Sequence, residues 1–223
     1  MRIVRLWRVG LMVFLGATFF TSGMAKLYAG HHFPGWIGPV WLIEKLQAYQ
    51  LGMYAAFIAF SQVITGFLLL TRRFWLLGAI ALMPMLLNIL LITISQQWAG
   101  TPYVIGVLLL MNIALLLSEY RRLRVLWMDA PYAPRLGSQP KRTVAGHLLW
   151  TLGLVLVVAA IFVSYQALSL SYWLVGSGLL LAWLSFLADQ PRSVATFLPP
   201  APHDSYCTSR LCLPHFSASL LGV

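Results

Sequence analysis

Acidic residues and cysteines are scarce in this sequence. Among its 223 residues, Asp and Glu together number 5 and Cys numbers 2, against 15 Lys and Arg. Both cysteines lie near the C-terminal end, which excludes a disulfide-stapled scaffold and a paired-cysteine redox centre within the apolar segments. The chain also lacks a phosphate loop, a nucleophile elbow, a zinc-protease motif and a pair of carboxylates suited to catalysis. We therefore predict no catalytic residues and no activity of its own for this chain.

Charge is also rare, and apolar residues dominate. The chain is 60% hydrophobic and 9% charged, too little polar surface to cover a water-soluble globule. The apolar runs are about 20 residues long and do not alternate, as helices in hydrocarbon require. We predict an all-α, polytopic transmembrane helix bundle in contact with membrane lipids. The net charge of +10 would suggest nucleic acid in a soluble protein, but here the place of each cation relative to the helices is more informative.

The hydropathy pattern predicts about six spans. The first could be mistaken for a signal peptide because of its basic start, but it is long enough to span and lacks a clean cleavage signal. The last two share an uncharged stretch with a polar dip, and an alternative makes one of them re-entrant. The predicted spans are approximately residues 9–28, 51–70, 74–94, 101–118, 143–163 and 172–188.

The cations predict the orientation, because short cytoplasmic loops carry an excess of Lys and Arg. With six spans, Lys26 and Lys45 fall on or near one side, and all other cations fall on the opposite side. This pattern predicts a plasma (inner) membrane protein with both termini in the cytoplasm, and tryptophans near both ends of the helices agree. The predicted cytoplasmic cations are Arg2, Arg5, Arg8, Arg72, Arg73, Arg121, Arg122, Arg124, Arg135, Lys141, Arg142, Arg192 and Arg210.

Composition divides the chain into four parts. Residues 1–120 hold four predicted helices, 121–142 form a basic, proline-containing cytoplasmic loop, 143–188 form a two-helix hairpin, and 189–223 form a proline-rich tail that we predict to be disordered. The tail carries four candidate soft metal ligands. Their spacing departs from the usual zinc knuckle, so we favour a tail with reduced thiols and no metal. These residues are His203, Cys207, Cys212 and His215.

Three short motifs lie along the first predicted helices: Phe20-Thr-Ser-Gly-Met-Ala-Lys-Leu27 closes the first helix, and residues 65–72 and 84–90 lie in the second and third. The first motif resembles the signature that ends the first helix in the DoxX family of membrane proteins, and the other two resemble that family's second and third helices. The likeness covers about residues 5–120. It implies a four-helix bundle that acts as a small subunit of, or partner to, a membrane redox enzyme, with a quinone as the implied ligand. Gln62 stands where many members carry a glutamate, which removes the acid from that position.

Five polar residues within the predicted spans are candidate ligand-binding residues: Ser22, Lys26, Gln62, Asn88 and Asn112. Ser22 and Lys26 share one face of the first helix. The lysine either extends to the interface or faces the bundle, where it could bind an anionic or carbonyl oxygen. Glu44 is a candidate ion-pair partner for it. The three amides must point inward, either as structural hydrogen bonds between helices or as the lining of a cavity.

A few smaller signals concern packing and metal binding. Pro84, one turn before Asn88, predicts a bend beside a pocket. Gly66, Gly176 and Gly178 predict close approach of helices. The adjacent His31 and His32 could bind a metal or haem, but neighbouring residues seldom converge on one ion, so we favour no such site.

Three functions are compatible with this pattern. The DoxX resemblance favours a non-catalytic or quinone-linked subunit of a membrane redox system. A membrane scaffold or assembly protein without a ligand, whose basic loops attract anionic lipids or an acidic partner, is the alternative. A small-molecule transporter is less favoured, because no internal repeat is evident. The oligomeric state is not predicted.

Overall fold

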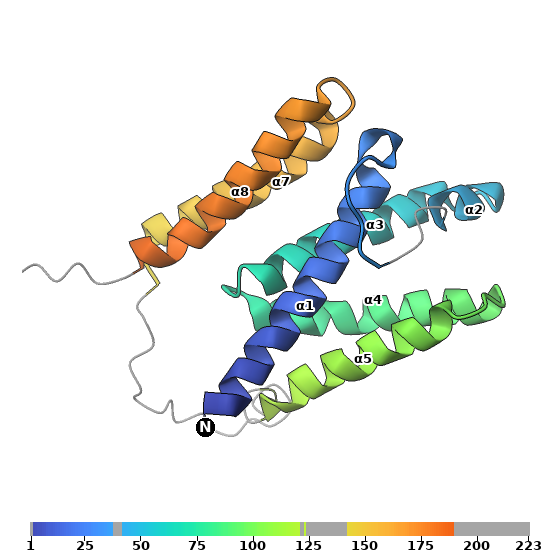
Figure 1. The fold of residues 1–223 in the computed structure, drawn as a ribbon, viewed down its shortest axis with the longest axis horizontal. Coiled ribbons are helices and arrows are strands. Elements are labelled where there is room, and N and C mark those ends of the chain that lie inside the picture. Colours follow the sequence, from blue (N-terminus) through green and yellow to red (C-terminus); the bar gives the residue numbers. More distant parts are fainter. Residues whose placement is uncertain (1, 38–41, 121–122, 124–141, 190–223) are drawn as a thin grey trace, which may run out of the picture. The chain divides into compact units, whose positions relative to one another are not determined.

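The computed structural model describes residues 2–37, 42–120, 123 and 142–189, and these are helical or in short connections. The helices are α1 (Arg2–Leu27), η1 (Ala29–His31), α2 (Leu42–Ala48), α3 (Gly52–Leu70), α4 (Trp75–Ser95), α5 (Thr101–Leu117), α7 (Val144–Val163) and α8 (Leu168–Ala188) (Figure 1). The basic loop lies almost entirely outside these residues, and the tail beyond Asp189 lies entirely outside them. So do its four candidate metal ligands, His203, Cys207, Cys212 and His215.

Five of the described helices are long and apolar enough to cross a membrane, namely α1, α3, α4, α7 and α8. The chain is thus a helical, multi-pass membrane protein. The sixth apolar helix, α5, has 17 residues and is about 26 Å long, less than the roughly 30 Å of a bilayer core. Helices α7 and α8, in the stretch where a re-entrant segment was the alternative, have 20 and 21 residues and are each long enough to span.

Four of the helices pack into one group. Helix α1 contacts α3 and α5, and α4 packs between α3 and α5, so the four helices close a ring. Leu15 and Met24 of α1 are fully buried, so α1 contributes to the core of this group. Helix α2 is a short addition that packs on α3 and was not predicted.

Glycine sets the distance between α1 and α3. A Cβ on Gly23 would lie 2.7 Å from the Ala59 carbonyl oxygen, and one on Gly66 would collide with the Phe20 backbone. Both positions therefore need a residue without a side chain, because the two backbones touch there. The prediction of close approach is confirmed for Gly66.

Helices α7 and α8 form an antiparallel hairpin. Gly153 and Gly178 face each other, since a Cβ on Gly178 would lie 2.7 Å from the Gly153 carbonyl oxygen. The prediction for Gly176 was wrong, because a Cβ there would meet nothing within 4 Å. Thr143 caps α7 by accepting a hydrogen bond from the Gly146 amide at 3.1 Å.

The outward surfaces of these helices are apolar, as lipid contact requires. Large apolar side chains in each long helix and in α5 are more than half exposed, and soluble monomers rarely expose so much apolar surface. Examples are Leu77, Leu91, Leu110, Leu148 and Leu180.

Candidate functional site

One face of α1 is polar over two helical turns, although it is buried in the bundle. Thr18, Ser22 and Lys26 follow one another at intervals of four residues, which places them in a row along the helix. Their exposed fractions are 1%, 4% and 5%. Lys26 therefore faces the bundle, and the interpretation in which it extends to the interface is wrong.

Lys26 is held by two neutral oxygens. Its Nζ donates to Ser22 Oγ at 2.9 Å and to Gln62 Oε1 at 2.7 Å. The contact with Gln62 exists because Gly23 and Gly66 bring α1 against α3 one turn from these side chains. Three of the five candidate residues, Ser22, Lys26 and Gln62, thus lie in direct contact.

No carboxylate pairs with Lys26 among the residues that the structure describes. Glu44, the partner suggested by the sequence, has an exposed side chain on α2, and the hydrogen bonds of Lys26 go to Ser22 and Gln62 instead. An ammonium group has three donors, of which two are used here. The third donor and the positive charge are available to a ligand.

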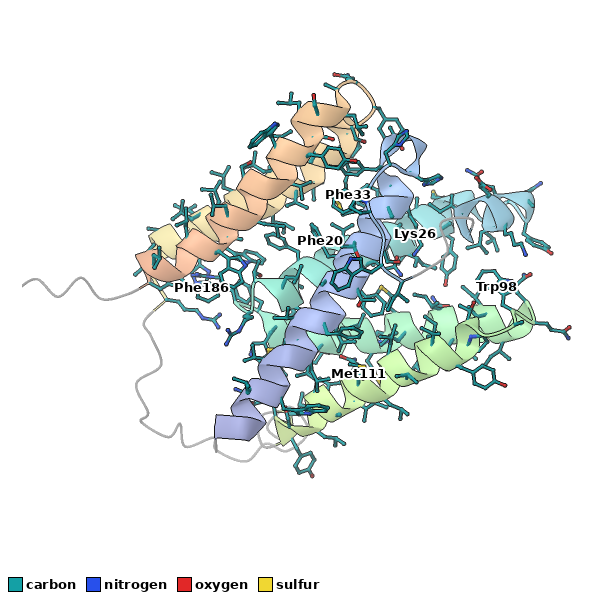
Figure 2. All side chains as sticks on the ribbon, in the orientation of Figure 1. Phe20, Lys26, Phe33, Trp98, Met111 and Phe186 are labelled. Carbon is teal, nitrogen blue, oxygen red and sulfur yellow. The ribbon has the colours of Figure 1, made fainter. Side chains whose placement is uncertain are left out.

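A cavity of about 180 Å³ adjoins Lys26 between α1, α3, α4 and α5. Figure 2 labels Lys26 on α1 and Trp98 in the connection between α4 and α5, and both line this cavity. Hydroxyl and amide groups line one part of the cavity and aliphatic side chains line the rest. Its polar lining comes from Thr18, Ser22, Lys26, Gln62, Thr93 and Thr101.

The Thr18 hydroxyl gives this cavity one further polar group without a partner. Its Oγ1 is buried and has no hydrogen-bond partner among the described residues. Buried hydroxyls are normally satisfied, so such a group calls for an explanation. Together with the third donor of Lys26, it equips the cavity to bind an oxygen-bearing group that is anionic or carbonyl-like.

Asn88 and Asn112 do not join this site. Asn88 Nδ2 donates to the Tyr54 hydroxyl, and Asn88 lines a separate pocket between α3 and α4 together with Pro84. Asn112 Nδ2 donates to the Ala79 carbonyl oxygen at 3.0 Å and so links α5 to α4. Both amides thus form hydrogen bonds between helices, as the interpretation of these residues as structural hydrogen-bonding groups predicts. The pocket predicted beside Pro84 is present, but it is not the Lys26 cavity.

His31 and His32 make hydrogen bonds within the chain. A ring nitrogen of His31 lies 3.0 Å from the Ala25 carbonyl oxygen, and the His32 carbonyl oxygen accepts from the Tyr172 hydroxyl at 2.8 Å. Within the described ranges, no three metal-ligating side chains gather at one point.

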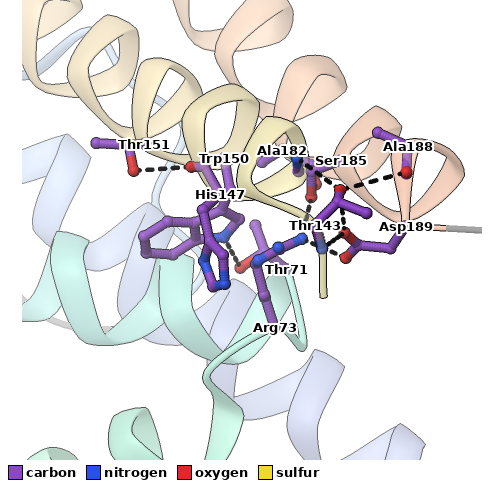
Figure 3. Close-up of polar contacts among 11 residues, drawn as sticks. Thr71, Arg73, Thr143, His147, Trp150, Thr151, Ala182, Ser185, Ala188 and Asp189 are labelled. Carbon is purple, nitrogen blue, oxygen red and sulfur yellow. Dashed lines mark hydrogen bonds and ion pairs between the residues drawn. The ribbon is translucent and has the colours of Figure 1, made fainter. Parts of the chain in front are cut away.

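A second buried cation lies at the other end of the helices, and the sequence did not reveal it. Arg73, 2% exposed, follows α3, and its Nη1 donates to Asp189 Oδ2 at 2.7 Å and to Ser185 Oγ at 3.2 Å (Figure 3). The Thr143 amide and hydroxyl donate to Asp189 Oδ1 at 2.8 and 2.9 Å. This cluster fastens both ends of the hairpin to the turn between α3 and α4.

Neighbouring contacts show how closely this cluster is packed. Trp150 Nε1 donates to the Thr71 hydroxyl at 2.9 Å, and a Cβ on Gly146 would collide with the Asp189 carboxylate. Burial raises the pKa of the Asp189 carboxyl, but the Thr143 hydrogen bonds and the Arg73 guanidinium outweigh it and hold that pKa below its ordinary value. Asp189 therefore stays ionised beside Arg73.

In comparisons with family models, with curated proteins and with solved structures, nothing matched this chain. The DoxX resemblance rests on its sequence motifs and stays a prediction.

Proposed function

We propose that this membrane protein binds a small ligand through Lys26 and acts as a non-catalytic subunit of a membrane redox system. The proposed ligand is a molecule with a carbonyl or anionic oxygen, and a quinone head group is the class that the DoxX-like motif favours. The proposal includes six spans with α5 as the shortest, a plasma (inner) membrane location and both termini in the cytoplasm.

The observation that carries the proposal is a buried lysine that lies beside a cavity and has no carboxylate partner in the part of the chain that the structure describes. Burying an ammonium group is costly unless it is paired, and two neutral hydrogen bonds supply only part of that pairing. A ligand oxygen in the cavity would complete it. Polar groups that converge in a mostly apolar pocket are the usual mark of a small-molecule site.

The cavity limits what can bind. Its volume of about 180 Å³ is below the range of about 300–1,000 Å³ typical of drug-sized ligand sites. The site therefore suits a single ring or a small anion, with any long tail left in the lipid. A quinone fits this description, since its ring carries two carbonyl oxygens and its tail is apolar.

The test is to purify the full chain in mild detergent and extract bound small molecules for mass spectrometry and absorption spectroscopy. We expect the wild-type chain to retain a quinone and the Lys26→Met variant to lose it, because methionine keeps the apolar stem but not the donor. Asn88→Leu is the matched control, since Asn88 is a polar residue of the same bundle outside the cavity. Equal retention by wild type and Lys26→Met would remove Lys26 from the site.

A scaffold protein without a ligand is the second candidate. It is favoured by the exposed cations Arg72 and Arg142 at the predicted cytoplasmic end, which could attract an acidic partner. Co-purification distinguishes the two functions. A scaffold would retain a partner protein equally in wild type and Lys26→Met, and neither sample would contain a quinone.

A further inference from the structure

A larger pocket, separate from the Lys26 cavity, opens at the predicted cytoplasmic end. Its volume is about 520 Å³, and it lies between the start of α1, the turn joining α3 to α4, and the C-terminal half of α8. Figure 2 labels Phe186, one of its lining residues, near the C-terminal end of α8. The proposed function makes no use of this pocket.

Both charged and apolar side chains line the pocket. Arg8 and Arg72 supply its cations, and Met12, Leu180 and Leu184 supply apolar wall. Leu180 and Leu187 are seven residues apart on α8, so the apolar wall extends about 10 Å along the helix. A ligand that fills the pocket therefore needs both a negative charge and a hydrocarbon chain.

The charged lining of the pocket has a net surplus of one cation among the described residues. Arg8 forms an ion pair with Glu119, and Arg72 is exposed with no ion pair to a described residue. The Arg8 Nε is also buried without a hydrogen-bond partner. One surplus positive charge and an unused guanidinium donor suit a group that carries one negative charge, such as a phosphodiester.

The backbone holds Arg72 at this point. Its φ of +55° is in the left-handed region, which a non-glycine residue seldom adopts, and it allows α3 to end and α4 to begin within a few residues. Such strain is a local cost that persists only where the surroundings enforce it. At this position the exposed Arg72 lines the pocket.

Two tryptophans flank the pocket, as in an interfacial aromatic belt. The Arg8 guanidinium lies 5.5 Å from the ring centre of Trp75, and Trp183 of α8 is 57% exposed. Tryptophan is enriched at the level of lipid head groups. Leu180 and Leu187 are each 61% exposed, so the pocket is open sideways to the hydrocarbon phase.

We propose that this pocket binds one anionic phospholipid, with its phosphate at Arg8 and Arg72 and an acyl chain along Met12, Leu180 and Leu184. The sideways opening favours a lipid over a soluble phosphate, because a soluble ligand would leave the apolar wall uncovered. The charge surplus favours an anionic lipid over a zwitterionic one, whose own cation would face the arginines.

The experiment measures lipid retention by the full chain with native mass spectrometry. The delipidated protein is titrated in detergent with phosphatidylglycerol or phosphatidylcholine of the same acyl chains. We expect a preference for phosphatidylglycerol, and we expect Arg72→Gln to weaken its affinity about fivefold, as for one cation near a membrane surface. Arg142→Gln is the matched control, since Arg142 is an exposed arginine that stacks on Phe74 outside the pocket, 5.1 Å from its ring centre.

Two further arms locate the lipid and its source. Leu184→Trp fills the apolar wall and should lower retention of phosphatidylglycerol, while Arg72→Lys should restore most of what Arg72→Gln loses. Glycerol phosphate, which has the head group without the chains, should not compete at equal concentration. Equal affinity for the two lipids, an equal loss in Arg142→Gln, or full competition by glycerol phosphate would overturn the proposal. Retention of neither lipid would also overturn it, because the pocket would then be closed by protein.

Discussion

Lys26 and Arg73 are two cations buried in the same membrane protein, and their surroundings differ in kind. Arg73 is 2% exposed, is paired with the Asp189 carboxylate and lines no pocket described above. Lys26 is 5% exposed, has only neutral oxygens as partners among the described residues and adjoins a cavity. The positive charge of Arg73 is balanced by a carboxylate, whereas no carboxylate among the described residues balances that of Lys26.

This difference separates a structural cation from a binding one. Arg73 and Asp189 are 116 residues apart in sequence, and their contact fixes the α7–α8 hairpin to the α3–α4 turn. That contact balances the charge of Arg73, although its Nε and Nη2 are buried without a hydrogen-bond partner among the described residues. Lys26 keeps a donor and its charge for a ligand. Burial alone would not have told these roles apart, whereas the partner and the adjoining space do.

The largest effect should come from breaking the ion pair. Arg73→Met leaves the Asp189 carboxylate buried without its partner, and we expect a loss of about 3–5 kcal/mol in the free energy of unfolding. Denaturant titration of the purified protein in detergent measures it. Arg72→Gln, at the exposed neighbouring position, should change stability little. Stability unchanged in Arg73→Met would mean that the cluster does not hold the hairpin.

A smaller effect is expected where α1 meets α3 and aligns Lys26 with Gln62. Gly66→Ala places a methyl group against the Phe20 backbone, so we expect a loss of about 1–3 kcal/mol in stability and weaker ligand retention. Gly176→Ala is the matched control, because a Cβ there meets nothing within 4 Å. Alanine favours a helix more than glycine does, so this control should be neutral or slightly stabilising. Equal effects at both positions would argue against the close approach.

Low pH should weaken the ion pair of Arg73, because it protonates the Asp189 carboxylate. The pKa of Asp189 is lowered in the folded protein, so its contribution to stability is present above the unfolded value of about 3.9 and is lost as the pH falls through the folded value. The thermal midpoint of the wild-type chain should therefore drop more below pH 4 than that of Asp189→Asn. Parallel curves for the two proteins between pH 7 and pH 3 would contradict this.

The smallest change in stability should follow removal of the Lys26 charge. Lys26→Met gives up two hydrogen bonds, each worth about 0.6 kcal/mol on average in membrane proteins, and it also removes a buried charge without a carboxylate partner. We expect stability within about 1 kcal/mol of wild type in the same denaturant titration. A loss as large as that of Arg73→Met would make Lys26 a structural cation as well.

Much of the helical arrangement was predictable, because an apolar run of about 20 residues has few other structures open to it in lipid. The contact among Ser22, Lys26 and Gln62 was also predictable, since polar groups in hydrocarbon must point inward. The separation of Asn88 from Lys26 was not, because it depends on which face α4 turns toward α3. That face is set by packing, and the sequence shows only that Asn88 needs a partner.

The Arg73 cluster was missed for a related reason. Arg73 was interpreted as one of the cations that end a span, and Asp189 as the first residue of a disordered tail. Each interpretation follows from local composition, whereas their pairing depends on how the hairpin docks. One signal was present: Asp189 is an acidic residue directly after an uncharged stretch, in a chain with only 5 acidic residues.

The most direct test of the central claim is to compare small molecules extracted from equal amounts of purified wild-type, Lys26→Met and Arg73→Met protein. The folded fraction of each sample is measured by size-exclusion chromatography. The account predicts a bound molecule with a carbonyl or anionic oxygen in wild type, its loss from folded Lys26→Met, and its presence in whatever fraction of Arg73→Met remains folded. Retention in folded Lys26→Met at the wild-type level would contradict the account.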